Sequence, residues 1–179
     1  MPDVTPMPTL TPDCTRCAAL CCVLLAYDAS RAFAEDKPAC APCRHLSDQN
    51  LCRIHANLPG HGFAGCAAYT CHGAGQRITS QVFSGRSWRE DPALMPAMDL
   101  AFRALRRLHE AAFLLQQAAT LPLTPDQDRQ RLALLAALTL DRDWDEASLA
   151  TAEQGPALRA VQPFLATLRG LPGLTPPRR

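Results

Sequence analysis

The segment Cys14-Thr-Arg-Cys17-Ala-Ala-Leu-Cys21-Cys22 places four cysteines within nine residues, and no other part of the sequence says as much about the fold. Two cysteines separated by two residues can turn their thiolates toward one metal ion, at about 2.3 Å each for zinc. Cys21 and Cys22 are adjacent in the chain, and adjacent residues of a helix project about 100° apart. We therefore expect these two thiolates to serve different metal ions or different sides of one cluster.

All nine cysteines of the 179-residue chain lie in its first half. Three further groups follow the first one: Cys40-Ala-Pro-Cys43, Cys52-Arg-Ile-His55 and Cys66-Ala-Ala-Tyr-Thr-Cys71. Such spacings favour metal ligation over the alternative, which is that the cysteines are small buried apolar residues. The predicted metal ligands are Cys14, Cys17, Cys21, Cys22, Cys43, Cys52, Cys66 and Cys71, followed in second place by Cys40 and His55.

The N-terminus, Met-Pro-Asp-Val-Thr-Pro, lacks the basic and apolar regions of a signal peptide. No run of about 18 apolar residues is present that could form a transmembrane helix. We therefore expect a cytoplasmic protein, in a compartment where structural disulfides are rare. An odd number of cysteines would also leave one thiol unpaired, so this context favours metal binding over a disulfide framework.

The overall composition is that of a globular protein, with 47% hydrophobic and 20% charged residues. A formal net charge of +1 gives no electrostatic reason to expect binding to nucleic acid or to an anionic membrane. Aromatic residues make up only 6% of the chain, which argues against surfaces on which bases stack. Neither nucleic acid nor membrane is therefore expected as a partner.

The two halves of the sequence differ in chemistry, because the second half is rich in Ala, Leu and Arg and has no cysteine. We divide the chain into a flexible arm (1–12), a Cys-rich metal- or cluster-binding domain (13–85), a helical region (91–171) and a loose tail (172–179). A segment as rich in cysteine as 13–85 rarely builds a sufficient apolar core alone, and it needs metal or helices for support.

Three or four short amphipathic helices are expected in the second half, with four candidate starts. They begin at Asp91-Pro92 or nearer Met95, at the capping box starting with Thr124, near 143–148, and at Pro156. Pro163 should kink the fourth helix or move its start later. The predicted fold is mostly α, with an irregular Cys-rich metal-knuckle domain and a C-terminal helical hairpin or bundle. The helices are interpreted as a packing scaffold, and a protein partner or self-association through them is the alternative.

One family shares the order of the cysteines. The elements Cys14-x2-Cys17-x3-Cys21-Cys22, Cys43-x2-Leu46, Cys52-Arg-Ile-His55 and Cys66-x2-Tyr69 resemble the YkgJ-type CxxCxxCC zinc- or iron-chelating domain family. Here three residues precede Cys21 where that family has two, and Ala67 stands where it usually has Arg. Cys40 and Cys71 lie outside the short signature. The resemblance implies a domain that binds zinc or iron through clustered cysteines.

Residues 13–76 are also similar to the N-terminal block of bacterial proteins labelled pentapeptide-repeat proteins. The shared elements include Asp36-Lys37-Pro38 and Cys71-His72-Gly73-Ala74-Gly75-Gln76. The repeat itself is missing, since Ala56-Asn57-Leu58 is a single match, so a pentapeptide β-helix is not expected. Related cysteine segments occur in a flagellin lysine methylase, where an iron–sulfur cluster is implied, but this chain has no adenosylmethionine motif of that kind.

The favoured function is binding of zinc or iron through clustered thiolates, in a structural or metal-handling role. The alternative is an iron–sulfur protein, for example with a [4Fe-4S] cluster, that has a redox or enzymatic role. Handling of Cu(I) is a further option, since thiolates are soft ligands. A thiol oxidoreductase would require a thioredoxin-like βαβ pattern, which the sequence does not show. No catalytic residues are assigned, and a non-enzymatic role is favoured.

Overall fold

The computed structural model describes residues 9–139 and 143–171. The loose tail predicted for 172–179, and residues 1–8 of the predicted arm, lie outside these ranges. The predicted mostly α fold is confirmed, because no strand forms in the described part of the chain. Its only β-type pairing there consists of two isolated bridges, Tyr27 with Lys37 and Leu46 with Cys52.

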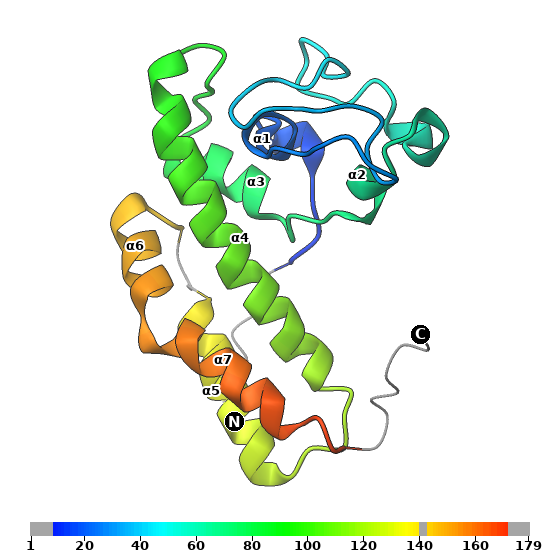
Figure 1. Cartoon of the computed structure of the whole chain (residues 1–179). Helices are drawn as coiled ribbons and strands as arrows, with labels where there is room; N and C mark the ends of the chain where they lie inside the picture. The colour runs from blue at the N-terminus through cyan, green and yellow to red at the C-terminus, as the bar shows by residue number, and fades with distance from the viewer. Residues whose placement is uncertain (1–8, 140–142, 172–179) are drawn as a thin grey trace.

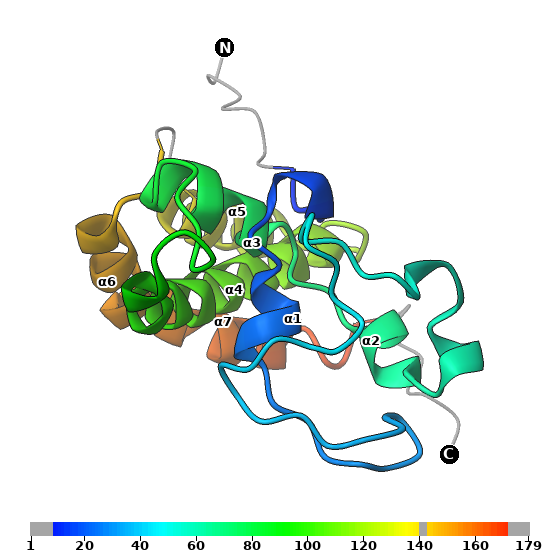
Figure 2. The same ribbon diagram turned by 90° about the horizontal axis from the view of Figure 1, so that it is seen from above.

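Four helices make up the second half of the molecule: α4 (Met95–Ala118), α5 (Pro125–Leu138), α6 (Glu146–Gln154) and α7 (Pro156–Thr167). The long helix α4 crosses the molecule, and the other three pack along it (Figure 1). Figure 2 shows the same arrangement from above, with the Cys-rich half on the other side of α4 from α6. The predicted C-terminal bundle is therefore present.

Helix α4 begins close to the expected position. The Asp91 carboxylate accepts a hydrogen bond from Ala93 N, and a short 3-10 turn (Pro92–Leu94) leads into the helix at Met95. One side of α4 is apolar along its whole length because apolar residues recur every three or four positions. The fully buried residues of this stripe are Met98, Phe102, Leu105, Leu108, Ala112 and Leu115.

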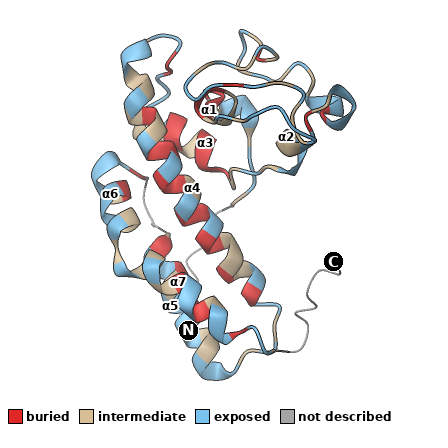
Figure 3. Ribbon diagram, viewed as in Figure 1, coloured by how far each residue is buried: buried red, intermediate tan, exposed pale blue. Residues whose placement is uncertain are grey.

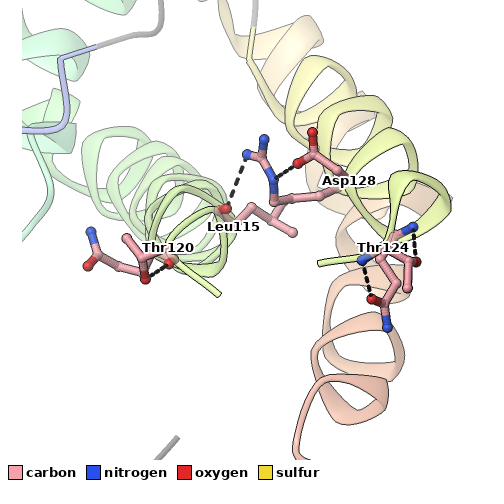
Figure 4. Close-up of polar contacts among 7 residues, drawn as sticks. Leu115, Thr120, Thr124 and Asp128 are labelled. Carbon is pink, nitrogen blue, oxygen red and sulfur yellow. Dashed lines mark hydrogen bonds and ion pairs between the residues drawn. The ribbon is translucent and has the colours of Figure 1, made fainter. Parts of the chain in front are cut away.

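The predicted capping box opens α5 (Figure 4). Thr124 Oγ1 accepts a hydrogen bond from Gln127 N at 3.2 Å, and Thr124 N donates to Gln127 Oε1 at 2.9 Å. The buried Arg131 then links α5 to α4, since its guanidinium donates to Asp128 Oδ1 at 2.7 Å and to the carbonyl of Leu115 at 3.4 Å.

The last two helices, α6 and α7, begin where the sequence predicts, but α7 does not start later because of Pro163. Asp145 and Ser148 form a capping box at the start of α6. Helix α7 begins at Pro156 and continues through Pro163, so the later start considered for it does not occur. The buried side chains of Val161 and Phe164 flank the proline and pack in the core, which offsets the hydrogen bond that proline cannot donate.

The Cys-rich half is irregular, as predicted. Its short helical pieces are α1 (Leu20–Leu24), α2 (Ala64–Ala68), α3 (Ala74–Arg77) and the 3-10 turns Cys14–Arg16, His55–Asn57 and Pro59–His61. A π-type turn, Ile78–Val82, continues α3. Loops make up most of the remainder, and they wrap around α1 (Figures 1 and 2).

A single apolar core runs through both halves of the molecule (Figure 3). Leu20 and Leu24 of α1 and Ile78 after α3 are fully buried in it together with the stripe of α4. The Trp88 indole is buried and donates a 2.7 Å hydrogen bond to the carbonyl of Ala18. The change in composition near residue 85 is therefore not a break in the core.

No helix among the described residues is both long enough and apolar enough to cross a lipid bilayer. This includes α4, whose polar side carries ion pairs between Arg103 and Asp99 and between Arg106 and Glu110.

The importance of the α4 stripe can be tested with Leu105→Ala. Leu105 is fully buried, so we expect the free energy of unfolding to fall by about 2–5 kcal/mol in urea denaturation. Leu100→Ala on the same helix is the matched control, because Leu100 is 72% exposed and should change stability by less than about 0.5 kcal/mol. Equal effects of the two substitutions would contradict this role of the stripe.

Candidate metal centre

All nine cysteines are free thiols. Cys14 and Cys40 are exposed and the other seven are partly buried. Five of the partly buried thiols pack against the apolar core, namely Cys17, Cys21, Cys22, Cys43 and Cys71. The structure thus gathers cysteines from separate segments of the sequence around helix α1.

The segment that contains Cys14 and Cys17 is fastened to α3. Asp13 N donates to Gln76 Oε1 at 2.8 Å, and Gln76 Nε2 donates to the carbonyl of Thr11 at 3.0 Å. The sulfur of Cys17 lies directly against Gly75, where an added Cβ would stand only 2.6 Å from it. The thiols of this segment are therefore held beside the start of α3.

Cys71 precedes a turn that helix α4 holds in place. His72 and Gly73 both adopt positive φ, 49° and 75°, which brings α3 back toward the core. The buried His109 of α4 has its Nδ1 at 2.7 Å from the carbonyl oxygen of His72, so Nδ1–H is the donor. The His72 ring stacks on Phe113 of α4 with ring centroids 4.6 Å apart. His109 is thus linked to the turn that follows Cys71.

Cys21 and Cys22 lie in the first turns of α1, and their sulfur atoms are 4.0 Å apart. Donation of a hydrogen bond from the Cys21 thiol to the Cys22 sulfur lowers the pKa of Cys22 and raises that of Cys21 well above its usual value. The positive charge of Lys37 lowers the pKa of Cys22 further. Of the two neighbours, Cys22 is therefore the more readily deprotonated.

Cys43 and Cys52 approach α1 from the long loop. Cys43 N donates to the carbonyl of Cys22 at 3.0 Å, and the Tyr27 hydroxyl lies 3.7 Å from Cys43 Sγ. The carbonyl of Cys43 accepts from Leu46 N at 2.9 Å, and Leu46 in turn pairs with Cys52 in an isolated antiparallel bridge. Cys22, Cys43 and Cys52 are thus joined by backbone hydrogen bonds.

Cys66 reaches the same neighbourhood through Phe63. Cys66 N donates to the carbonyl of Phe63 at 3.0 Å, and the Phe63 side chain is buried. The Phe63 ring makes edge contacts with Tyr27, at 6.2 Å between ring centroids, and with His45, at 5.1 Å. Because Tyr27 contacts Cys43, this aromatic cluster places Cys66 on the Cys43 side of the thiols.

A buried lysine accompanies the thiols. Lys37 is 5% exposed, and its ammonium donates to the carbonyls of Val23, Leu25 and Pro38 at 2.9, 2.6 and 3.0 Å. These three acceptors satisfy all three N–H bonds of the ammonium. A fixed positive charge next to several thiols offsets the negative charge that they acquire on deprotonation.

Most of the thiols are difficult to ionise without an added cation. Burial, with a smaller contribution from nearby thiolates, raises the pKa of Cys17 and that of Cys66 to about 11. Burial also raises the pKa values of Cys14 and Cys52. Only the thiolate is a good metal ligand, so binding of an ion here would release protons.

Within residues 9–139 and 143–171, no group of three or more Cys, His, Asp or Glu side chains is arranged so that it could hold a metal ion. Neutral thiols do not attract one another, and thiolates repel, so an ion must supply the attraction. Two observations fit such an ion: the donors are soft sulfur atoms, and the buried Tyr69 hydroxyl has no hydrogen-bond partner in the described structure. Tyr69 lies near Cys21 and Cys71, whose charges help burial to raise its pKa.

The two second-place candidates stand apart. Cys40 is exposed, adopts a positive φ of 56°, and is held by a long hydrogen bond from its N–H to the carbonyl of Leu24. His55 is exposed on a 3-10 turn, and its N–H donates to the carbonyl of Cys52. Neither position is buried among the other thiols.

Sequence reasoning missed the roles of Lys37 and Tyr27. Lysine is seldom buried, and the resemblance that includes Asp36-Lys37-Pro38 gave no indication that Lys37 is buried. A signal was available for the tyrosines, because both tyrosines of the chain, Tyr27 and Tyr69, lie within the Cys-rich half. In the structure each of them lies near a different set of thiols.

A polar cavity of about 450 Å³ opens beside the Cys14 segment but contains none of the predicted ligands. Its lining residues are Thr9, Thr11, Pro12, Asp13, Arg16, Gln76, Arg77 and Gln81. No cysteine lines this cavity, so it is not part of the thiol cluster.

Comparison with known proteins shows similarity to a bacterial protein. The chain is 40% identical over 114 residues to a Bacillus subtilis (strain 168) protein described as "Uncharacterized protein YybG". The match covers 64% of this chain and 41% of the relative, so the chain spans about two fifths of that protein's length. No protein-family model matches the chain, and no solved structure matches it.

Gly75→Ala tests the close approach of Cys17 to α3. An added methyl group would collide with the Cys17 sulfur, so we expect a loss of about 1–3 kcal/mol in the free energy of unfolding. Alanine normally stabilises a helix relative to glycine by about 0.5–1 kcal/mol, so the sign of the change is diagnostic. Gly170→Ala is the control, because no atom lies within 4 Å of its added Cβ. A more stable Gly75→Ala protein would disprove the contact.

The free energy of unfolding should depend on pH in part because His109 is buried. Burial holds its pKa at about 4, so the unfolded chain binds a proton between about pH 6.5 and pH 4 that the folded chain does not. Stability should fall as the pH is lowered through this range, by up to about 3 kcal/mol from this residue. His109→Gln keeps a donor for the His72 carbonyl but does not titrate. Urea denaturation of both proteins at several pH values should show a shallower loss for the variant, and parallel curves would refute the prediction.

Proposed function

We propose that this protein binds zinc or iron through clustered cysteine thiolates, in a structural or metal-handling role. One observation carries the proposal: free thiols from separate segments are gathered around helix α1, next to a buried lysine and a buried, unpartnered tyrosine hydroxyl. Disulfide formation would not require a fixed cation, whereas a cluster of metal-bound thiolates carries excess negative charge that Lys37 offsets.

The metal would also contribute to folding. The Cys-rich half has few regular elements, and much of it is loop. Metal-binding free energy adds directly to folding free energy when the site does not exist in the unfolded chain. Zinc suits this role because it takes four thiolates in tetrahedral geometry and has no redox chemistry. A zinc-loaded protein would then act through stability or through delivery of the ion.

An iron–sulfur protein, for instance with a [4Fe-4S] cluster, is the second candidate. The observation that favours it is the position of the two tyrosine hydroxyls, since Tyr27 contacts Cys43 and Tyr69 lies near Cys21 and Cys71. Hydrogen bonds to cluster sulfur raise the reduction potential, and so does a nearby positive charge such as that of Lys37. A redox or enzymatic role would follow from this candidate, whereas zinc binding favours a non-enzymatic one.

The proposed metal ligands all lie in the Cys-rich half, so metal binding would not occupy the surface of the helical bundle. Leu100 on α4 and Leu132 on α5 are exposed, at 72% and 49%. Binding of a protein partner, or of a second copy of the chain, through the helices stays a prediction. The cytoplasmic location also stays a prediction.

The deciding experiment is purification without oxygen, followed by an absorption spectrum and elemental analysis. Zinc in a colourless protein would support the first candidate. Iron with acid-labile sulfide and broad visible absorption would support the second. A protein that contains no metal, and that takes up neither Zn²⁺ nor Fe²⁺ with sulfide under reducing conditions, would overturn the proposal.

A double substitution, Cys17→Ser with Cys22→Ser, should abolish metal uptake and lower the melting temperature. The reason is that both thiols belong to the group around α1, and serine is a poor ligand for soft metals. Metal content by elemental analysis and thermal unfolding followed by circular dichroism are the measurements. Cys40→Ser is the matched control, because Cys40 is exposed at the margin of the cluster and its loss should leave metal content unchanged.

A further inference from the structure

We propose that the cysteines are divided between two neighbouring metal centres with four thiols each, and that Cys40 belongs to neither. This inference rests on the proposed metal-binding function and deepens it. The first centre, centre A, consists of Cys14, Cys17, Cys21 and Cys71. The second, centre B, consists of Cys22, Cys43, Cys52 and Cys66.

Centre A is defined by the contact between the Cys14 segment and α3. The Asp13–Gln76 hydrogen bond and the contact of Cys17 Sγ with Gly75 bring this segment to the residues that follow Cys71. Cys71 is joined to α3 directly, because its carbonyl accepts from Ala74 N at 3.0 Å. Cys21 is assigned to this centre because it is adjacent to Cys22 on α1 and adjacent helical residues project about 100° apart.

Centre B is defined by a separate set of contacts. Cys43 N donates to the carbonyl of Cys22, and Cys52 is reached through its bridge with Leu46. Cys66 joins through Phe63, whose ring packs against Tyr27, the residue in contact with Cys43 Sγ. None of these contacts involves α3.

The two centres lie side by side, because the Cys21 sulfur of centre A and the Cys22 sulfur of centre B are 4.0 Å apart.

Each centre has its own tyrosine. The Tyr27 hydroxyl contacts Cys43 of centre B, whereas the buried Tyr69 hydroxyl lies near Cys21 and Cys71 of centre A. A hydrogen bond from a phenol to a metal-bound thiolate reduces the electron density on sulfur, so each tyrosine should tune only the centre beside it.

The test is titration of the full-length, reduced protein with Co²⁺ and Zn²⁺, because cobalt thiolates absorb in the near ultraviolet and visible. We expect two ions per chain for the wild type. Cys71→Ser should lose one ion from centre A, and Cys66→Ser should lose one from centre B, with the second ion retained in each. The Cys71→Ser/Cys66→Ser protein should lose both, and Cys40→Ser neither.

A second readout remains available if a cysteine variant does not fold. Tyr27→Phe and Tyr69→Phe remove only a hydroxyl group, and each should shift the Co²⁺–thiolate absorption of one centre while the other stays unchanged. A single ion per chain, loss of both ions on either single cysteine substitution, or the same spectral shift in both tyrosine variants would overturn the two-centre division. Binding of no Co²⁺ or Zn²⁺ by the wild type would instead overturn the proposed function.

Discussion

Both halves of this protein depend on the same apolar stripe of helix α4. One part of the stripe receives α1 and α3 from the Cys-rich half, and helices α5, α6 and α7 pack along the same helix. The Cys-rich half is largely loop, so it has few regular elements of its own to define its shape. Its loops adopt a defined arrangement because they are anchored to a long helix, chiefly through α1, the Trp88 indole and the His109–His72 hydrogen bond.

In the Cys-rich half, the close spacing of the thiols determines the chemistry. Buried thiols in close proximity resist ionisation, since each thiolate loses hydration and repels its neighbours. The chain places one cation, Lys37, among them and satisfies it with three backbone carbonyls instead of a carboxylate. Its charge therefore remains uncompensated by any acid in those contacts, and it is available to the sulfur atoms. Such an arrangement favours a metal–thiolate cluster over a set of independent thiols.

The sequence predicted the helical half well because its signals are local. The Thr124 capping box, the Asp91 cap and the spacing from Met98 to Leu115 each depend on residues a few positions apart. The arrangement of the Cys-rich half depends on contacts between residues that are far apart in the sequence, such as Asp13 with Gln76 and Trp88 with Ala18. No spacing rule reports these contacts, so the sequence predicts candidate ligands but not how they are grouped in space. Burial of Lys37 was hidden for the same reason.

The order of the cysteines along the chain has a consequence for how the two proposed centres would fill. Every member of centre B lies between Cys21 and Cys71, the last two members of centre A in sequence, so one centre is nested within the other. Filling the inner centre would shorten the effective loop that the outer centre has to close, and the entropy cost of closure falls with loop length. The first ion would therefore prepare the site for the second. Cooperative loading would arise from chain connectivity alone, without any change in the ligands of the outer centre.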